Sequence, residues 1–230
     1  MTAKKKYHHG NLRKQLIDTA LEIIAADGLE KVSMRGLGSR IGVSRTAPYR
    51  HFKNKSQLLS AIAEEGYGRL AWVLNDVNTR ASDDSLAKLM DAGIAYVEFA
   101  VSNPVHYRIM FGNEIRESDR PPSFLDAVGT AFNELLHAVQ ACQSDKMIKP
   151  FNPMIIANTL WALAHGISTL LIDGQVPMEN AFRDLPVLLQ EKEESARPDI
   201  RRIFESISPI LFTGLLPDPP FRVWTDPLKL

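Results

Sequence analysis

Apolar residues recur at steps of three and four residues along most of the chain, whereas the apolar–polar alternation typical of a β-strand hardly occurs. Such spacing gathers apolar side chains on one face of a helix, which then packs against its neighbours. Residues that favour turns separate the helical runs, at 83–84, 102–104, 118–123, 149–153, 173–177 and 195–199. The pattern therefore predicts an all-α protein.

The first two predicted helices are bounded by capping residues. The first covers residues 12–27, with Asn11 as its N-terminal cap and Gly28 as a left-handed stop. The second begins after Ser33 and ends at Gly42. A helix this short is not stable alone, so it must pack against its neighbours.

A further short helix follows the turn at Gly42, and the two lie within the stretch SMRGLGSRIGVSRTAPYRHFKNK, residues 33–55. This order is that of a helix-turn-helix unit. Gly42 permits the positive φ of a sharp turn, and Gly38 lets the two helices approach closely. The expected inner face consists of Met34, Leu37, Ile41, Val43, Pro48 and Phe52.

The residues left on the outer face suit the major groove of DNA, because they combine hydroxyl, guanidinium, phenol and imidazole groups. Arg45 can form two hydrogen bonds with guanine O6 and N7, whereas Tyr49, Lys55 and the helix start near Asn54 are placed for phosphate oxygens. The candidate DNA-binding residues are Arg35, Ser44, Arg45, Thr46, Ala47, Tyr49, Arg50, His51 and Lys55.

Pro48 leaves two possible starts for this recognition helix. If Ser44 caps the helix, one backbone hydrogen bond is lost at the proline. If Thr46 caps it, Pro48 falls in the first turn, where no backbone donor is needed. In both cases we expect the proline ring to pack against the preceding helix.

A longer fourth helix is predicted after Asn54, which forms a capping-box arrangement with Gln57. Later in the chain, residues 150–172 carry no charge and are long enough to span a membrane. Two prolines shorten that helix, however, and polar groups such as His165 would lie at membrane depth. We expect instead a helix buried on two sides, between the core and a partner subunit.

Charge divides the chain into two unequal parts. The 230 residues have no net charge, but residues 1–56 hold 12 Lys and Arg against 4 Asp and Glu, so the remainder is acidic. A compact basic module indicates a polyanionic partner, although a solvated basic face is the alternative. The single cysteine, Cys142, and the absence of an apolar leader after the basic N-terminus favour the cytoplasm.

The stretch YHHGNLR…ALEIIAADGLEKVSMRGLGSRIGVSRTAPYRHFKNKSQLL, about residues 7–70, closely resembles the N-terminal domain of the TetR/AcrR family of transcriptional regulators. Further on, SNPVHYRIMFG and the Trp161, His165, Gly166 spacing look like the TetR subgroup named for its Trp-His-Gly signature. The resemblance implies a homodimer that represses transcription until a small molecule shifts the fourth helix. It also makes residues 44–51 the recognition helix and Lys55 a phosphate contact.

The predicted domains follow from these features. Residues 1–55 are expected to bind palindromic operator DNA, residues 56–215 to bind a ligand and dimerise, and residues 216–230 to form a proline-rich tail. We expect the dimer face within residues 153–172, for its missing charge, and 199–213, by resemblance. The latter carries an apolar stripe of Ile203, Ile207, Ile210 and Leu211.

Candidate residues for binding a small-molecule effector come from the aromatic and methionine positions of the larger domain. They are Phe99, Tyr107, Met110, Phe111, Phe132, Trp161 and His165, with Tyr96 and Phe124 as further members of the same set. Residues of these types at helical spacing are also typical of an ordinary core. His165 in particular has the alternative role of a core histidine that donates to a carbonyl.

Other kinds of site have little support in the sequence. No nucleophile, base and orienting residue occur at a recognisable spacing, so we expect neither an enzyme nor a cofactor. Adjacent His8 and His9 lack nearby carboxylates or cysteines, and no metal site is predicted. GLGSRIG lies in mid-helix without a preceding strand, which argues against nucleotide binding. The alternative to a regulator is a cytoplasmic small-molecule binding protein or enzyme that retains a helix-turn-helix.

Overall fold

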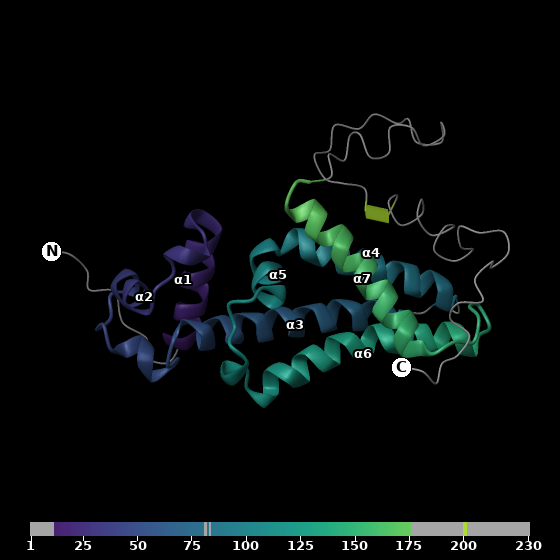
Figure 1. The fold of residues 1–230 in the computed structure, drawn as a ribbon, viewed down its shortest axis with the longest axis horizontal. Coiled ribbons are helices and arrows are strands. Elements are labelled where there is room, and N and C mark those ends of the chain that lie inside the picture. Colours follow the sequence, from purple (N-terminus) through teal and green to yellow (C-terminus); the bar gives the residue numbers. More distant parts are fainter. Residues whose placement is uncertain (1–11, 81, 83, 176–199, 202–230) are drawn as a thin grey trace, which may run out of the picture.

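The computed structural model describes residues 12–80, 82, 84–175 and 200–201, and in these residues it is entirely helical (Figure 1). The prediction of an all-α protein is confirmed. The α-helices are α1 (Leu12–Asp27), α2 (Met34–Ile41), α3 (Lys55–Thr79), α4 (Ser85–Ser102), α5 (Pro104–Phe111), α6 (Pro122–Ser144) and α7 (Pro153–Ile172). Short 3-10 helices cover Leu29–Lys31, Ala47–Arg50 and Glu117–Asp119.

Helix α2 begins and ends at the residues that the sequence indicates. The Ser33 hydroxyl accepts a hydrogen bond from the Gly36 N–H at 3.1 Å, which satisfies a free donor at the helix start. Gly42 follows the last turn with φ 82°, in the left-handed region. Gly28 after α1 also has a positive φ, 94°, but its ψ of 161° lies outside the left-handed helical region. Asn11 lies outside the described residues.

The recognition helix differs from its prediction. A turn at Arg45 and Thr46 leads into a 3-10 helix of four residues, Ala47–Arg50, instead of a helix over residues 44–51. Its bonds join residues three apart, for example the Tyr49 N–H and the Thr46 carbonyl at 3.2 Å. Thr46 precedes this helix, and neither its hydroxyl nor that of Ser44 caps the backbone. Pro48 is the second residue, where its missing N–H costs little.

Helix α3 runs from the helix-turn-helix unit through the rest of the molecule (Figure 1). The Asn54 side chain accepts a hydrogen bond from the Gln57 N–H at 2.8 Å, as the capping box predicts. The return bond reaches one residue further back, because Gln57 Oε1 accepts from the Lys53 N–H at 2.9 Å. Since α3 packs against α1 and also against α4, α5 and α6, it connects both parts of the chain.

Helices α4, α5 and α6 pack against α3, and α7 packs against α4 and α6. Helix α6 runs beside α3 in the same direction, since Ser123 contacts Glu64 near its start and Glu134 contacts Asn75 further along. The turn signals in the sequence mark real boundaries: Asp84 and Asn152 cap α4 and α7, and proline is the first residue of α5, α6 and α7.

The uncharged helix α7 is covered on one side only in this single chain. Ala157, Ala164 and Ser168 are buried, whereas Met154, Ile155 and Leu170 are between 40% and 52% exposed. The expectation of burial between the core and a partner subunit stays a prediction. By length and composition α7 is also the one helix among the described residues that can cross a membrane.

Several predictions concern residues outside the described ones. They are the basic N-terminus with His8 and His9, the stripe of Ile203, Ile207, Ile210 and Leu211, and the proline-rich residues 216–230.

Candidate nucleic-acid interface and ligand cavity

The outer face of the helix-turn-helix unit is exposed and polar. Ser44, Arg45, Thr46, Arg50 and His51 are all exposed. Tyr49 has 44% of its surface exposed, and only Ala47 is half-buried. The Ser44 and Thr46 hydroxyls lie 3.3 Å apart and form a hydrogen bond with each other rather than with the backbone. A row of side chains able to donate and accept hydrogen bonds thus projects from one side of the unit.

The inner face holds this row in place. Pro48 is fully buried, and a Cβ placed on Gly38 would lie 3.2 Å from its ring and 3.3 Å from the Ser44 carbonyl oxygen. The close approach that we predicted for Gly38 and the packing of the proline ring against α2 are both confirmed. Phe52 is buried, and the Arg13 guanidinium of α1 lies 5.3 Å from the centre of its ring.

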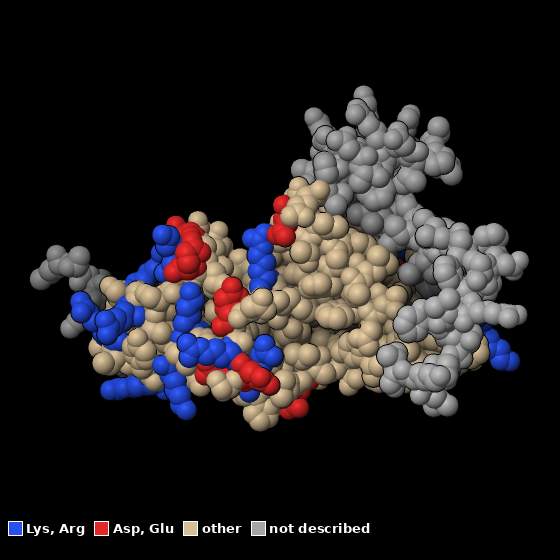
Figure 2. All heavy atoms as spheres, viewed as in Figure 1, with Lys and Arg blue, Asp and Glu red and all other residues tan. Residues whose placement is uncertain are grey.

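Basic side chains gather at this end of the molecule (Figure 2). Arg35, Arg40, Arg45, Arg50 and Lys53 are exposed there, whereas the visible face of α4 to α7 carries few charges. Lys55 differs from them, because it is half-buried and its ammonium donates a hydrogen bond to the Leu29 carbonyl. That bond ties the start of α3 to the 3-10 helix after α1.

An apolar cavity of about 280 Å³ lies between α3, α4, α5, α6 and α7. Its lining consists of Tyr67, Leu70, Leu74, Tyr96, Phe111, Val128, Ala131, Phe132, Leu135, Asn158 and Trp161. None of these residues is charged, and Asn158 is the only one classed as exposed. Tyr67 fixes one wall, since its hydroxyl donates to the Met110 carbonyl at 2.9 Å and its ring meets Phe111 and Phe124 edge-on.

A second cavity of about 270 Å³ lies on the other side of Phe111, which lines both. Its other walls include Tyr107, His165, Thr169 and an ion pair between Arg108 and Asp173 at 2.9 Å. Between the two cavities, the Tyr107 hydroxyl lies 2.7 Å from His165 Nδ1 and 3.1 Å from the Tyr96 hydroxyl. These hydroxyl and imidazole groups form a continuous chain from α4 through α5 to α7.

Burial governs the ionisation of these groups. Loss of solvent raises the pKa of Tyr67 to about 12 and raises the pKa values of Tyr96 and Tyr107 as well. The same effect lowers the pKa of His165 below its usual value of 6.5. Near pH 7 the walls of both cavities therefore present neutral phenols and a neutral imidazole. Among the described residues, His165 bonds to the Tyr107 hydroxyl and to no carbonyl, so its expected alternative role is not found there.

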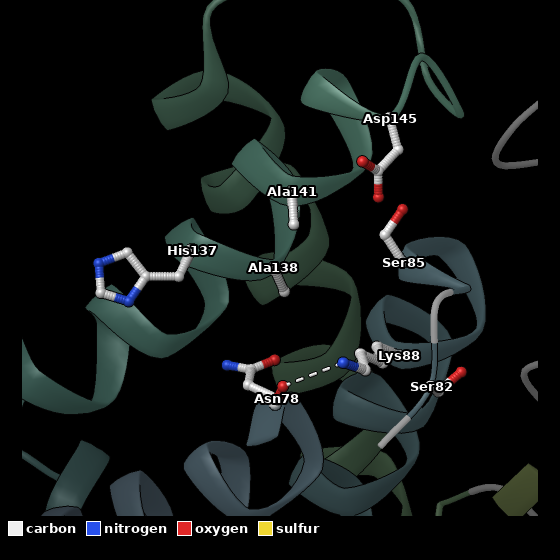
Figure 3. A pocket seen from close by; sticks show the side chains of 8 residues that line it. All are labelled: Asn78, Ser82, Ser85, Lys88, His137, Ala138, Ala141 and Asp145. Atoms are coloured by element: carbon white, nitrogen blue, oxygen red, sulfur yellow. Dashed lines mark hydrogen bonds between the residues drawn. The ribbon is translucent and has the colours of Figure 1, made fainter. Parts of the chain in front are cut away.

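A third cavity, of about 470 Å³, lies at the far end of α3 and is polar (Figure 3). Residues from α3, α4 and α6 surround it, including Asn78, Ser85, Lys88 and Asp145. Lys88 donates to the Asn78 carbonyl at 3.3 Å, and the buried Ser85 hydroxyl has no partner among the described residues. None of the candidate residues from the sequence lies here.

Two family profiles match the chain, and both belong to one family. The profile described as "Bacterial regulatory proteins, tetR family" covers residues 16–62, and "Tetracyclin repressor-like, C-terminal domain" covers residues 89–188. The chain belongs to the TetR family. The first match contains α2 and the recognition element, and the second contains most of the helices that line the apolar cavity.

Individual relatives agree with this assignment. The tetracycline repressor protein class C of Escherichia coli is 48% identical over 52 residues, 23% of this chain and 24% of that protein. The regulator AcrR of Shigella flexneri is 28% identical over 102 residues, 44% of this chain and 47% of that protein. The chain thus spans 24% and 47% of the length of these two curated relatives. A Rhodococcus protein described as of unknown function shares the fold over 92% of this chain and 98% of its own, at 26% identity and a TM-score of 0.71.

Within this TetR fold, the predicted ligand residues separate into three groups. Phe111, Phe132 and Trp161 line the apolar cavity, and Tyr107 and His165 line its neighbour. Met110 instead packs against Gly66 of α3, and Phe99 is buried in the core without lining either cavity. Sequence reasoning missed the wall contributed by α3, Tyr67, Leu70 and Leu74, and also Asn158 and the α6 residues Val128, Ala131 and Leu135. Tyr67, Leu70 and Leu74 have the heptad-like spacing of core residues. The sequence therefore contains no signal that would distinguish a cavity wall from the core at these positions.

The loop between α5 and α6 joins the cavity to the DNA-binding end. Phe111 ends α5, and the loop after it contacts the start of α3 at two points. The Arg116 N–H donates to the Ser56 hydroxyl at 2.9 Å, and Asn54 Nδ2 lies 3.3 Å from Asp119 Oδ1. Asn54 is the residue that caps α3, so a shift of this loop reaches the helix that follows the recognition element.

Proposed function

We propose that the protein is a repressor of transcription that binds palindromic operator DNA as a homodimer in the cytoplasm and is released by a small-molecule effector. The observation that carries the proposal is the recognition element. Its apolar residues are packed against α1 and α2, and its hydroxyl, guanidinium and phenol groups all remain exposed. The relatives named above as regulators support a regulatory rather than an enzymatic role.

In the proposed complex the exposed row enters the major groove. Arg45 reads guanine through its two-pronged guanidinium, and Ala47 is small enough to contact a thymine methyl. Tyr49, Arg50 and Lys55 contact phosphates, together with the start of α3. The 3-10 helix is only four residues long, so one copy buries too little surface for tight specific binding. A two-fold pair of chains doubles that surface and explains why we propose a palindrome.

The exposed apolar side of α7 is the surface that we assign to the partner subunit. Met154, Ile155 and Leu170 lie on it and leave large apolar areas in solvent. A second copy related by two-fold symmetry covers the same surface on both chains. Residues 199–213 remain part of this proposal by resemblance.

The apolar cavity is the proposed effector site. It has the concave, mainly apolar lining with few polar groups that is typical of small-molecule sites. Trp161, His165 and Gly166 on α7 support placing the chain in the Trp-His-Gly subgroup. A ligand there displaces Phe111 and α3, and the contacts of Ser56 and Asn54 with the α5–α6 loop carry that shift to the recognition element.

Selection from a pool of random duplexes tests the DNA-binding proposal. The full chain is expected to enrich an inverted repeat whose half-sites lie about 34–36 Å apart, or a multiple of that distance. Arg45→Ala should change the recovered bases at one position of each half-site, at a cost of about 1–3 kcal/mol. Lys55→Ala should instead weaken all duplexes alike, and its unfolding temperature is measured in parallel because Lys55 also bonds to Leu29. Recovery of no common sequence would contradict the proposal.

A further inference from the structure

The hydrogen-bonding capacity left over in the apolar cavity indicates the chemistry of its ligand. We propose that the cavity takes a small, neutral, mainly aromatic molecule that donates a hydrogen bond through a hydroxyl group. This inference rests on the proposed function, in which the same cavity is the effector site. It adds a chemical class and a polarity to that site.

Neutrality follows from the lining. The lining residues that the structure describes include no Lys, Arg, His, Asp or Glu, so a charged ligand would be buried without a partner. Glu134, the chain neighbour of the lining residue Leu135, is already bonded to Asn78 and Asn75. An anion or a cation in this cavity therefore loses its hydration and gains no opposite charge.

Size and shape restrict the ligand further. A volume of about 280 Å³ lies near the lower end of ordinary ligand pockets, which span roughly 300–1,000 Å³. Five of the lining residues are aromatic, one from each of five helices, so a planar ring can stack or pack edge-on against several of them. These two features favour a molecule of about two fused rings over a long acyl chain.

The hydrogen bonds among the polar side chains at the cavity walls indicate that the ligand carries a hydroxyl group. The Tyr67 hydrogen is used in the bond to the Met110 carbonyl. Because His165 is neutral and a phenol is a stronger acid than an imidazole N–H, we assign the hydrogen between Tyr107 and His165 to Tyr107. Tyr107 can then only accept from Tyr96, which uses the Tyr96 hydrogen as well.

The walls consequently offer more acceptors than donors. The oxygens of Tyr67 and Tyr96 keep lone pairs, and the Trp161 N–H already faces the Tyr96 oxygen. Asn158 Nδ2 donates one of its two hydrogens to the Met154 carbonyl at 2.8 Å, which leaves one N–H and the carbonyl oxygen without partners among the described residues. The acceptors of Tyr67, Tyr96 and Asn158 still outnumber this one donor. A ligand hydroxyl satisfies such acceptors, whereas an ether or ester oxygen meets other lone pairs.

Three naphthalene derivatives of similar size separate these properties in calorimetric titrations of the full chain at pH 7.5. The donor 2-naphthol is expected to bind. The acceptor-only 2-methoxynaphthalene should bind about tenfold more weakly, because it leaves the acceptors unpaired. The anion 2-naphthoate should bind at least about a hundredfold more weakly, because its charge has no partner. Equal or tighter binding of either analogue, or no binding of 2-naphthol up to millimolar concentration, would overturn the proposal.

Two substitutions on α6, one turn apart, localise the site. Ala131 lines the cavity and is 5% exposed, so Ala131→Leu fills it and should abolish 2-naphthol binding. Ala127 is half-buried outside the lining, and Ala127→Leu should leave binding unchanged. Tyr67→Phe removes one acceptor and should reduce the preference for 2-naphthol over its methyl ether. The reverse ranking of the two alanine variants would place the ligand elsewhere.

Duplex binding of the same samples keeps the two proposals distinguishable. If the chain binds DNA but not 2-naphthol, the proposed ligand class is wrong and the proposed DNA-binding function is retained. If it binds 2-naphthol but not DNA, the ligand class is retained and the DNA-binding function is wrong.

Discussion

Gly38 and Pro48 show how single residues set the shape of the recognition element. The absence of a side chain on Gly38 leaves room for the proline ring and for the Ser44 carbonyl. Each residue is unfavourable in a helix by itself, since glycine lowers helix propensity and proline removes a donor. Together they bring the recognition element close to α2, and the exposed residues are thereby held in a fixed row.

Gly38→Val is expected to destabilise the protein by about 1–3 kcal/mol, because the new methyl groups meet the Pro48 ring and a backbone oxygen. Duplex affinity should fall with it. Chemical denaturation measures the first effect. Gly68→Ala in α3 is the control, since a Cβ there meets nothing within 4 Å, and it should stabilise by about 0.5–1 kcal/mol. Unchanged stability of Gly38→Val would contradict the close-packing account.

Sequence reasoning succeeded at residues whose role is local. Ser33, Gly42 and Asn54 act within three or four residues of their own position, and each has the predicted conformation or bond. It did not foresee that the helix around Pro48 is of the 3-10 type. The local sequence hardly distinguishes 3-10 hydrogen bonds, which reach the third preceding residue, from α-helical ones, which reach the fourth. Packing against α2 decides between the two helix types.

Helix α5 is the element through which the DNA-binding end and the cavity meet. It contacts α1 and α3 on one side and carries Phe111 and Tyr107 toward the cavities on the other. His106 on α5 is buried, its Nε2 has no partner among the described residues, and it packs near Gly66 of α3. Burial lowers the pKa of His106, and Arg69 lowers it further while Glu65 opposes the shift.

The free energy of unfolding is expected to fall as the pH decreases from about 7 to 5.5. His106 and His165 both have pKa values below the unfolded value of about 6.5, so the unfolded chain binds more protons in that range. Stability is fully present above 6.5 and is lost as the pH falls through the folded pKa values. His106→Leu should reduce this slope in urea titrations at several pH values. An unchanged slope would show that His106 is not the cause.

Sequence reasoning was weaker for contacts between elements. Tyr107 and His165 are 58 positions apart, and their hydrogen bond arises because α5 and α7 both pack against α4. The cavity likewise draws its walls from five helices, so helical spacing alone identified some lining residues and also core residues such as Phe99.

The molecule has a basic end, formed by the helix-turn-helix unit, and a larger part in which the apolar helix α7 is exposed on one side. Charge segregation in the sequence already indicates this division, and Figure 2 shows the basic residues at one end. The sequence left the role of α7 open, because a helix that lacks charges suits a core and an interface equally. The exposed apolar residues of α7 favour the proposed dimer interface.

Ile155→Glu is expected to convert the dimer to a monomer, because it places a charge in the proposed apolar interface. Sedimentation velocity checks the mass, and affinity for a palindromic duplex should fall at the same time. Leu125→Glu on α6 is a matched control, since Leu125 is 59% exposed and Ile155 is 52% exposed. The account fails if the control dissociates and Ile155→Glu does not.

The salt dependence of binding to the selected palindrome tests the central claim most directly. Fluorescence anisotropy between about 50 and 200 mM salt gives the slope of log affinity against log salt. If the basic end of a dimer neutralises five or more phosphates, that slope is steeper than about −4, and affinity falls more than a hundredfold over this range. A weak affinity with a flat dependence on salt would contradict the account.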